Sequence, residues 1–203
     1  MQSPTLKLEN QLKRQGYKYI AGIDEAGRGT LAGPVVVATV IMNYESGIMN
    51  YGIRDSKLLT PKKREELFKI ITKKALAWGV GKTSEKIIDR IGIAKANVLA
   101  VKKTLEALKV KPDYLLLDGG IKLKIKIPQK TIIKGDTKVF SIACASILAK
   151  VTRDRLMIKL DKKYPQYGFA QHKGYGTQAH IKAIKKYGPC PIHRRSFAPI
   201  NSL

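Results

Sequence analysis

Acidic residues are scarce in this sequence, in which 15 aspartates and glutamates stand against 39 lysines and arginines, for a net charge of +24. Such an excess is extreme for a folded domain and indicates a polyanionic partner, with nucleic acid favoured. An anionic membrane surface is the alternative, but no helical pattern pairs a continuous basic face with exposed tryptophan or phenylalanine, so it ranks lower. The same charge opposes self-association, so we expect a monomer.

Cysteine is nearly absent, because Cys144 and Cys190 are the two in the chain. They do not make a disulfide framework, and no Cys/His cluster has the spacing of a zinc site. We expect each to be a small buried apolar side chain or a free thiol.

Long apolar runs are also missing, since none approaches the roughly 20 residues needed to cross a bilayer. The first four residues lack the charged and apolar blocks of a secretory signal. We therefore expect a cytoplasmic protein without a membrane partner.

The composition is otherwise that of a globular protein, with 203 residues of which 44% are hydrophobic. Strand patterns alternate with helical ones, which predicts an α/β layered domain. Residues 1–16 are expected to form a short polar helix or arm. The other expected elements are strands at 19–24, 32–42, 78–82, 114–118 and 121–127, and helices at 61–77, 84–110 (broken near Gly92), 139–163 and 178–187.

The most informative stretch is an apolar run that meets Asp24-Glu25, turns through Gly27-Arg28-Gly29 and resumes as a second apolar run. Glycines at such a bend let backbone N–H groups approach an anion. A β-hairpin with a charged turn is the alternative, and the acidic doublet alone favours it.

Two further apolar segments also end in acids, at Asp118 and Asp136. Carboxylates that converge in a buried place repel each other unless a cation neutralises them. Oxygen-rich sites suit Mg²⁺ or Mn²⁺, and two such ions about 4 Å apart promote phosphodiester cleavage. A basic surface with an acidic metal pocket is the electrostatic layout of a nuclease.

Adjacent residues of an ideal strand point to opposite faces, so Asp24 and Glu25 cannot both enter one site from it. We therefore expect the strand to end at this pair and the glycine bend to turn the side chain of Glu25 into the same site as Asp24.

These motifs, together with several others, resemble those of type 2 ribonuclease H (ribonuclease HII). The matches run in order from about residue 19 to 198, with suitable spacing. They comprise residues 21–29 and 31–34, Asp55-Ser56-Lys57-Leu58, Leu117-Asp118-Gly119, Lys134-Gly135-Asp136, 141–143, 145–155, Gly174-Tyr175-Gly176-Thr177 and His193-Arg194-Arg195-Ser196-Phe197.

The resemblance implies a ribonuclease-H-like α/β fold, with a central mixed β-sheet flanked by helices and a small C-terminal helical portion. It divides the chain into a catalytic domain, 1–163, and a helical portion, 164–203, that packs on it and contacts substrate. The implied activity cuts the RNA strand of RNA/DNA hybrids and nicks duplex DNA 5′ of embedded ribonucleotides, leaving 3′-hydroxyl and 5′-phosphate ends.

The resemblance also implies roles for single residues. Asp24, Glu25, Asp118 and Asp136 would be the catalytic acids that bind Mg²⁺ or Mn²⁺. Gly27, Arg28 and Gly29 would recognise the 2′-hydroxyl and a nearby phosphate through the backbone, Tyr175 would pack on the deoxyribose beside the ribonucleotide, and Lys57 would contact phosphate. A solvated surface lysine is the alternative for Lys57.

The chain departs from the family pattern at Thr30, where proline is usual, and at Cys144, where alanine is usual. Gly92 and Gly120 also replace commoner residues. These departures put local rigidity in doubt rather than the chemistry. Type 3 enzymes differ at the central position of the Gly-Arg-Gly motif and carry an extra N-terminal domain, so Arg28 and the short leader argue against them.

A non-catalytic basic nucleic-acid-binding protein is the alternative function, with acids that only end strands. The variant Asp24→Asn separates the two, because only an enzyme has cleavage to lose. Asp154 is interpreted as an ion-pair partner within its helix. No serine or cysteine nucleophile stands at a recognisable spacing from His172, His180 or His193, so a catalytic triad is unsupported; His193 is expected to help pin the tail.

Overall fold

The computed structural model describes residues 3–119 and 122–202. Its strands and helices alternate much as the sequence predicts. In chain order they are α1 (Lys7–Arg14), β1 (Ile20–Ala26), β2 (Val35–Met42), α2 (Pro61–Lys74), β3 (Ala75–Thr83), α3 (Glu85–Ile91), α4 (Ile93–Ala107), β4 (Tyr114–Asp118), β5 (Gln129–Ile132), α5 (Phe140–Lys163), α6 (Phe169–His172) and α7 (Gln178–Tyr187).

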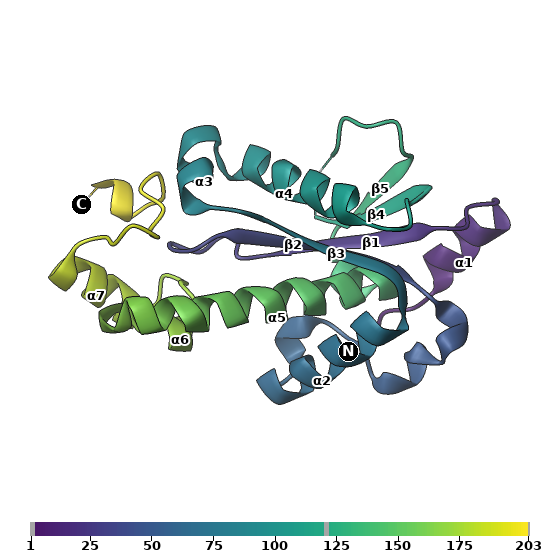
Figure 1. Cartoon of the computed structure of the whole chain (residues 1–203), viewed down its shortest axis with the longest axis horizontal. Coiled ribbons are helices and arrows are strands. Elements are labelled where there is room, and N and C mark those ends of the chain that lie inside the picture. Colours follow the sequence, from purple (N-terminus) through teal and green to yellow (C-terminus); the bar gives the residue numbers. More distant parts are fainter. Residues whose placement is uncertain (1–2, 120–121, 203) are drawn as a thin grey trace.

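Within the described residues the strands form one five-stranded sheet in the order β3-β2-β1-β4-β5. β1 pairs antiparallel with β2 and parallel with β4, and β4 pairs parallel with β5, so the sheet is mixed. Helices α3 and α4 cover one face, while α5, with α2 beside it, covers the other (Figure 1). The predicted α/β sandwich with a central mixed sheet is confirmed.

β2 shows why the sheet takes helices on both faces. All eight of its residues are buried. Val35, Val37 and Ile41 belong to the apolar cluster on the α4 side, and Val40 and Met42 belong to the cluster on the α5 side. A strand that is apolar on both faces has to be covered on both.

The N-terminal end of α5 lies unusually close to β1. A Cβ atom built on Gly22 would stand 2.2 Å from the carbonyl carbon of Ser141. The small residues at the start of α5, Ser141, Ala143, Cys144 and Ala145, let its backbone lie against the sheet. This close approach also brings Ser146, one turn further along α5, toward the end of β1.

Element boundaries follow recognisable signals. Thr60 accepts a hydrogen bond from the N–H of Lys63 and Pro61 opens α2, as predicted. α2 ends at Lys74 rather than near residue 77, and β3 then starts at Ala75 and takes up the apolar residues at that junction.

The strand predicted at 121–127 is wrong for its described part, and residue 121 lies outside the described residues. Residues 122–128 form an irregular segment, and β5 follows it. The side chain of Gln129 bonds both backbone groups of Leu123, at 2.9 Å each, and Leu123 is buried. The apolar residues that alternate with lysine therefore pack onto the α4-side cluster without a strand partner.

The C-terminal portion lies at one end of α5 (Figure 1). Its buried Phe169 and Ile184 form a cluster that also contains Leu31, Ala32 and Met157 from the first 163 residues. The boundary at 163/164 stays a prediction, since this cluster is built from both sides of it. Both cysteines are buried free thiols, as expected. No helix of the described chain is long and apolar enough to span a bilayer.

Candidate active site

Three aspartates meet at one end of the sheet. The parallel register of β1 and β4 pairs Ile23 with Leu117, which places Asp24 beside Asp118. Asp136 comes from the 3₁₀ turn Gly135–Thr137 after β5, and the N–H of Gly135 donates to Asp118 at 2.6 Å. One carboxylate oxygen from each aspartate lies within 4.8 Å of the others. These three acids could hold a metal ion.

Burial makes this cluster electrostatically costly. Asp24 and Asp136 are only 5% and 4% exposed. Burial, with the charges of Glu25 and Asp118 added, raises the pKa of Asp24 well above its usual range. Burial and Asp55 raise the pKa of Asp136, although Lys57 opposes them. Carboxylates arranged in this way favour a bound cation.

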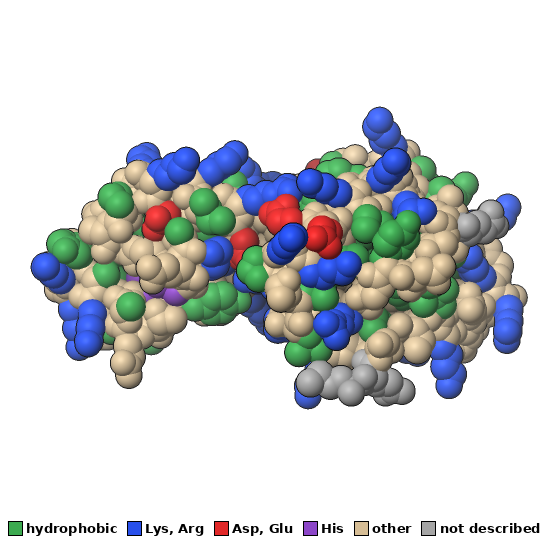
Figure 2. Space-filling view, turned by 90° about the horizontal axis from the view of Figure 1, so that it is seen from below, with side chains coloured by type: hydrophobic (Ala, Val, Ile, Leu, Met, Phe, Trp, Pro, Cys, Tyr) green, Lys and Arg blue, Asp and Glu red, His purple; other side chains and the backbone are tan. Residues whose placement is uncertain are grey.

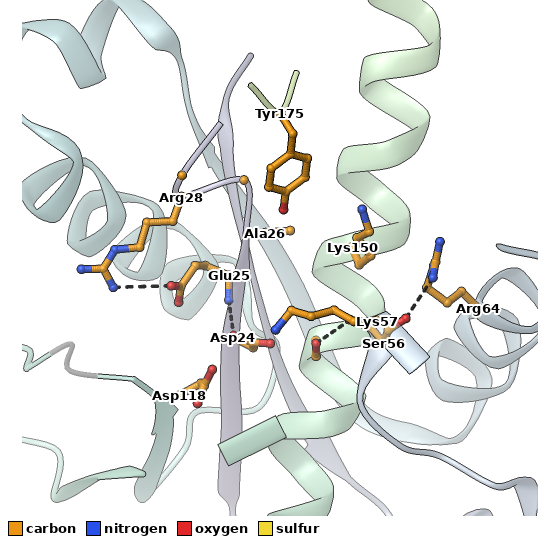
Figure 3. Close-up of a pocket in the computed structure, with 13 residues that line it drawn as sticks. Asp24, Glu25, Ala26, Arg28, Ser56, Lys57, Arg64, Asp118, Lys150 and Tyr175 are labelled. Atoms are coloured by element: carbon orange, nitrogen blue, oxygen red, sulfur yellow. Dashed lines mark hydrogen bonds and ion pairs between the residues drawn. The ribbon is translucent and has the colours of Figure 1, made fainter. Parts of the chain in front are cut away.

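Glu25 does not join the three aspartates as the sequence suggested. β1 continues through Ala26, so the strand does not end at the acidic pair, and that expectation is wrong. The carboxylate of Glu25 lies 3.6 Å from the guanidinium of Arg28 (Figure 3). Burial raises the pKa of Glu25, Arg28 lowers it, and Asp118 raises it again. The charge of Asp118 therefore acts on Glu25, although Glu25 approaches from the other face of the strand.

The Gly27-Arg28-Gly29 bend is held by a buried arginine from the C-terminal tail. Arg194 is fully buried and donates to the carbonyl oxygens of Gly27 at 2.6 Å and Arg28 at 2.8 Å. It also donates to Gly33 at 3.0 Å. The carbonyls of the bend therefore face inward and are already bonded.

A second buried arginine, Arg153 of α5, fixes the next stretch of the loop. It donates to the hydroxyl of Thr30 at 2.9 Å and to the carbonyl of Ala32 at 3.0 Å. Thr30 in turn donates to the loop carbonyls, so this departure from the family pattern supplies a bond where proline has none. Gly27 has φ +87°, and a Cβ there would stand 1.9 Å from Nε of Arg153. A glycine is required at this position.

The remaining predicted residues lie around one cavity of about 650 Å³. Lys57 places its ammonium 3.4 Å from Asp136. Burial alone would lower the pKa of Lys57, but Asp136 and Asp55 outweigh it and raise the pKa. Tyr175 is 44% exposed and stands across the cavity from the acids (Figure 3). The predicted residues that line the cavity are Asp24, Glu25, Gly27, Arg28, Gly29, Lys57, Asp118 and Tyr175.

Four other polar residues that line this cavity had no role predicted from the sequence, namely Ser56, Arg64, Ser146 and Lys150. Ser146 bonds Ser56 at 2.9 Å and also bonds Asp24, which lowers the pKa of Asp24 against the effect of burial. The carboxylate of Asp154 lies 2.9 Å from the ammonium of Lys150 and 3.7 Å from the guanidinium of Arg64. Asp154 is therefore an ion-pair partner, as predicted, with Lys150 on its own helix and with Arg64 on α2. The i, i+4 spacing of 146, 150 and 154 on α5 was the available signal.

The C-terminal tail is tied to Tyr175 through a pair of buried histidines. Nδ1 of His180 lies 2.8 Å from the carbonyl of Tyr175, which can only accept, so Nδ1–H donates and Nε2 of His180 is an acceptor. Nε2–H of His193 fills that role at 3.0 Å, and its Nδ1 accepts from the N–H of Cys190 at 2.9 Å. The geometry supports the expectation that His193 pins the tail.

This arrangement requires both rings to be neutral, which gives a pH dependence. Burial lowers the pKa of His180 and of His193 to about 4, from an ordinary value of 6.5. Between pH 4 and pH 6.5 the unfolded chain then binds more protons than the folded chain. The two histidines therefore make their full contribution to the free energy of unfolding above pH 6.5, and this contribution is lost as the pH falls toward 4. We expect a loss of roughly 2–4 kcal/mol over this range.

Chemical denaturation at a series of pH values checks this expectation. A variant with His180→Gln and His193→Gln should show a flatter profile over the same range, with lower stability at neutral pH. An identical pH slope in the wild type and the variant would contradict the assignment.

The family model of ribonuclease HII matches residues 21–200. The chain belongs to the ribonuclease HII family. The ribonuclease HII of Geotalea daltonii is 54% identical over 200 residues, which cover 98% of this chain and 92% of that protein. Members of the ribonuclease HII family are metal-dependent endoribonucleases, so this chain is an enzyme, a hydrolase that acts on RNA/DNA hybrids.

Solved structures agree with the fold. The ribonuclease H2 of Pyrococcus horikoshii OT3 has a TM-score of 0.78 and 29% identity, covering 91% of this chain and 96% of that one. A Bst ribonuclease HIII solved with Mn²⁺ has a TM-score of 0.68 at 19% identity, covering 90% and 68%. The second likeness concerns the ribonuclease-H-like fold alone.

Proposed function

We propose that this ribonuclease HII cuts the RNA strand of hybrids and nicks duplex DNA 5′ of an embedded ribonucleotide, leaving 3′-hydroxyl and 5′-phosphate ends. The observation that carries the proposal is the meeting of three aspartates, the buried Asp24 and Asp136 and the half-buried Asp118, within 4.8 Å of one another and beside the Gly27-Arg28-Gly29 bend. The role is ribonucleotide removal from DNA. The enzyme acts as a monomer.

The donor set fits hard divalent cations. Asp24, Asp118 and Asp136 offer carboxylate oxygens alone, with raised pKa values at Asp24 and Asp136, and oxygen ligands suit Mg²⁺ and Mn²⁺. Glu25 completes the proposed set of four acids from the opposite face of β1. Two bound ions would supply activation of the attacking water and stabilisation of the leaving oxygen.

The protein's own residues position the substrate. The backbone of Gly27, Arg28 and Gly29 reads the 2′-hydroxyl, the local feature that distinguishes RNA from DNA. Inward bonding of the bend's carbonyls to Arg194 leaves the bend rigid for this task. Tyr175, standing across the cavity, packs on the neighbouring deoxyribose and reports the junction. Lys57 contacts the phosphate.

The C-terminal portion, 164–203, contributes Tyr175 to this cavity and in this proposal contacts the substrate directly. Its position is coupled to the bend, because the N–H of Leu31 bonds the carbonyl of Gly174 at 2.8 Å. The two recognition elements are therefore held in register.

A labelled DNA duplex with one internal ribonucleotide tests the proposal. It is incubated with Mg²⁺, with Mn²⁺ and with chelator, beside an all-DNA duplex of the same sequence as control. We expect a single metal-dependent nick on the 5′ side of the ribonucleotide. Cleavage of long hybrids alone would discard the roles of the bend and Tyr175, and no cleavage with either metal would overturn the proposal.

A further inference from the structure

A second groove opens beside the active-site cavity, on the far side of Arg28. Its volume is about 490 Å³, and Arg28 lines both it and the active-site cavity. The other polar residues along it are Lys95, Asn97, Lys102, Lys122 and Lys124. None of the described residues that line it is acidic.

One wall of the groove is a face of α4. Lys95 and Lys102 are seven residues apart, two turns of helix, and therefore share a face. The opposite side of α4, with Ala96, Ala100 and Val101, is buried in the core against the sheet. The helix is thus fixed by its apolar side while its lysines project into the groove.

The other wall is the irregular segment that follows β4. Leu123 is buried, and Gln129 bonds its N–H and its carbonyl. Lys122 and Lys124 flank this anchored residue and both line the groove. The failure of residues 122–127 to form a strand is what brings these two lysines opposite α4.

Arg28 is paired with Glu25, but within the described chain the four lysines of the groove have no such compensation for their charge. Within residues 3–119 and 122–202, no ion-pair partner is found for Lys95, Lys102, Lys122 or Lys124. Like charges that line one groove repel each other, and an anion bound between them removes this cost. Asn97, which also lines the groove, is 1% exposed and points toward Glu25, so it belongs to the wall that separates the groove from the acids.

We propose that this groove binds the sugar–phosphate backbone of the substrate beyond the cleaved position, independently of base sequence. Nucleic acid is favoured over an acidic peptide because Arg28 makes the groove continuous with the cavity in which the strand is cut. The four lysines neutralise consecutive phosphates and orient the duplex across the bend. This inference rests on the proposed function of the neighbouring site.

The test measures binding without cleavage. Fluorescence anisotropy of a labelled ribonucleotide-containing duplex is followed against salt in chelator, using the variant Lys95→Gln, Lys102→Gln, Lys122→Gln, Lys124→Gln. A matched variant carries the same change at Lys69, Lys109, Lys162 and Lys185, which are exposed and line neither cavity. Loss of up to four phosphate contacts should reduce the slope of log K against log salt by about 2–4 and weaken binding about tenfold or more at low salt.

Duplex length locates the effect. Duplexes shortened on one side or the other of the ribonucleotide are compared. Shortening the side that lies in the groove should abolish the difference in affinity between the wild type and the groove variant, and shortening the other side should leave it. Equal affinity and equal salt slope in the groove variant and the matched variant would overturn the inference. It would also be overturned if the groove variant bound the duplex normally and lost only the binding of a polyglutamate peptide. Cleavage by the wild type is scored separately, so a duplex that binds through the groove without being cut would refute the proposed function and leave the groove standing.

Discussion

Replacing Asp24 by asparagine is expected to reduce metal-dependent cleavage roughly a thousandfold or more, because each tenfold corresponds to about 1.4 kcal/mol and a lost metal ligand costs several kcal/mol. Asp24 has a carboxylate oxygen within 4.8 Å of one from Asp118 and one from Asp136, and no other carboxylate comes from its face of β1 at that point. The measurement is the single-turnover rate on the ribonucleotide-containing duplex in Mg²⁺ and in Mn²⁺.

The same change should make the protein more stable when chelator is present. Burial and the neighbouring acids raise the pKa of Asp24, so its charge at neutral pH disfavours the folded state, and a neutral amide of the same shape removes that cost. Loss of activity with a higher melting temperature would exclude unfolding as the cause. Asp113→Asn is the control, because Asp113 bonds the N–H groups of Lys18 and Tyr19 and lies outside the cavity. Cleavage by Asp24→Asn at the rate of this control would contradict the assignment.

Replacing Arg194 by methionine should destabilise the fold and loosen substrate recognition together. The change leaves the carbonyls of Arg28 and Gly33 without their side-chain donor and removes one of the two bonds to the carbonyl of Gly27, which still accepts from Thr30. Unpaired buried groups cost about 1–3 kcal/mol each, so we expect a loss of roughly 3–5 kcal/mol in the free energy of unfolding. A displaced bend should also slow cleavage at the single ribonucleotide on the order of a hundredfold, since misplacement by about 1 Å has effects of that size.

Arg195→Ala is the matched control, because Arg195 is the adjacent arginine and is exposed. Denaturation measures the stability of both variants, and cleavage is measured below their melting temperatures on a single-ribonucleotide duplex and on a long hybrid. A positioning role predicts that Arg194→Met loses more on the single-ribonucleotide duplex than on the hybrid. Equal losses on both substrates would assign Arg194 to stability alone, and an unchanged melting temperature would refute the bonding described here.

Arg194 also shows that a buried charge can persist without a carboxylate at ion-pair distance among the described residues, since Glu85 and Asp89 act on it only as more distant charges. Burial, together with the charge of Arg153, lowers its pKa to about 9, so it stays protonated near neutral pH. Its compensation comes from backbone carbonyls of the bend. The tail that carries it is joined to Tyr175 through His193 and His180, so the bend and Tyr175 depend on the same few residues.

Local sequence was enough for most elements. The alternation of apolar runs and helical spacings predicted β2, β4, α5 and α7, and α2 begins at residue 61, as predicted. It failed at residues 122–127, where the apolar alternation typical of a strand belongs to a segment packed onto α4. Periodicity records which side chains are buried, and it does not record which backbone groups find partners.

The sequence by itself determined that this protein has a basic surface, a layered α/β core and acids at the ends of apolar runs. Figure 2 shows lysine and arginine spread over one face, with few acids. It also carried the family motifs. Tertiary structure alone decided that Asp24, Asp118 and Asp136 converge while Glu25 approaches from the other face. It also decided that Arg153 and Arg194 hold the glycine bend. It brought lysines of α4 and of residues 122–124 to one groove. The physical reason is that these contacts join residues far apart in the chain, through strand register and the packing of α5 and the tail, and no local pattern encodes such distances.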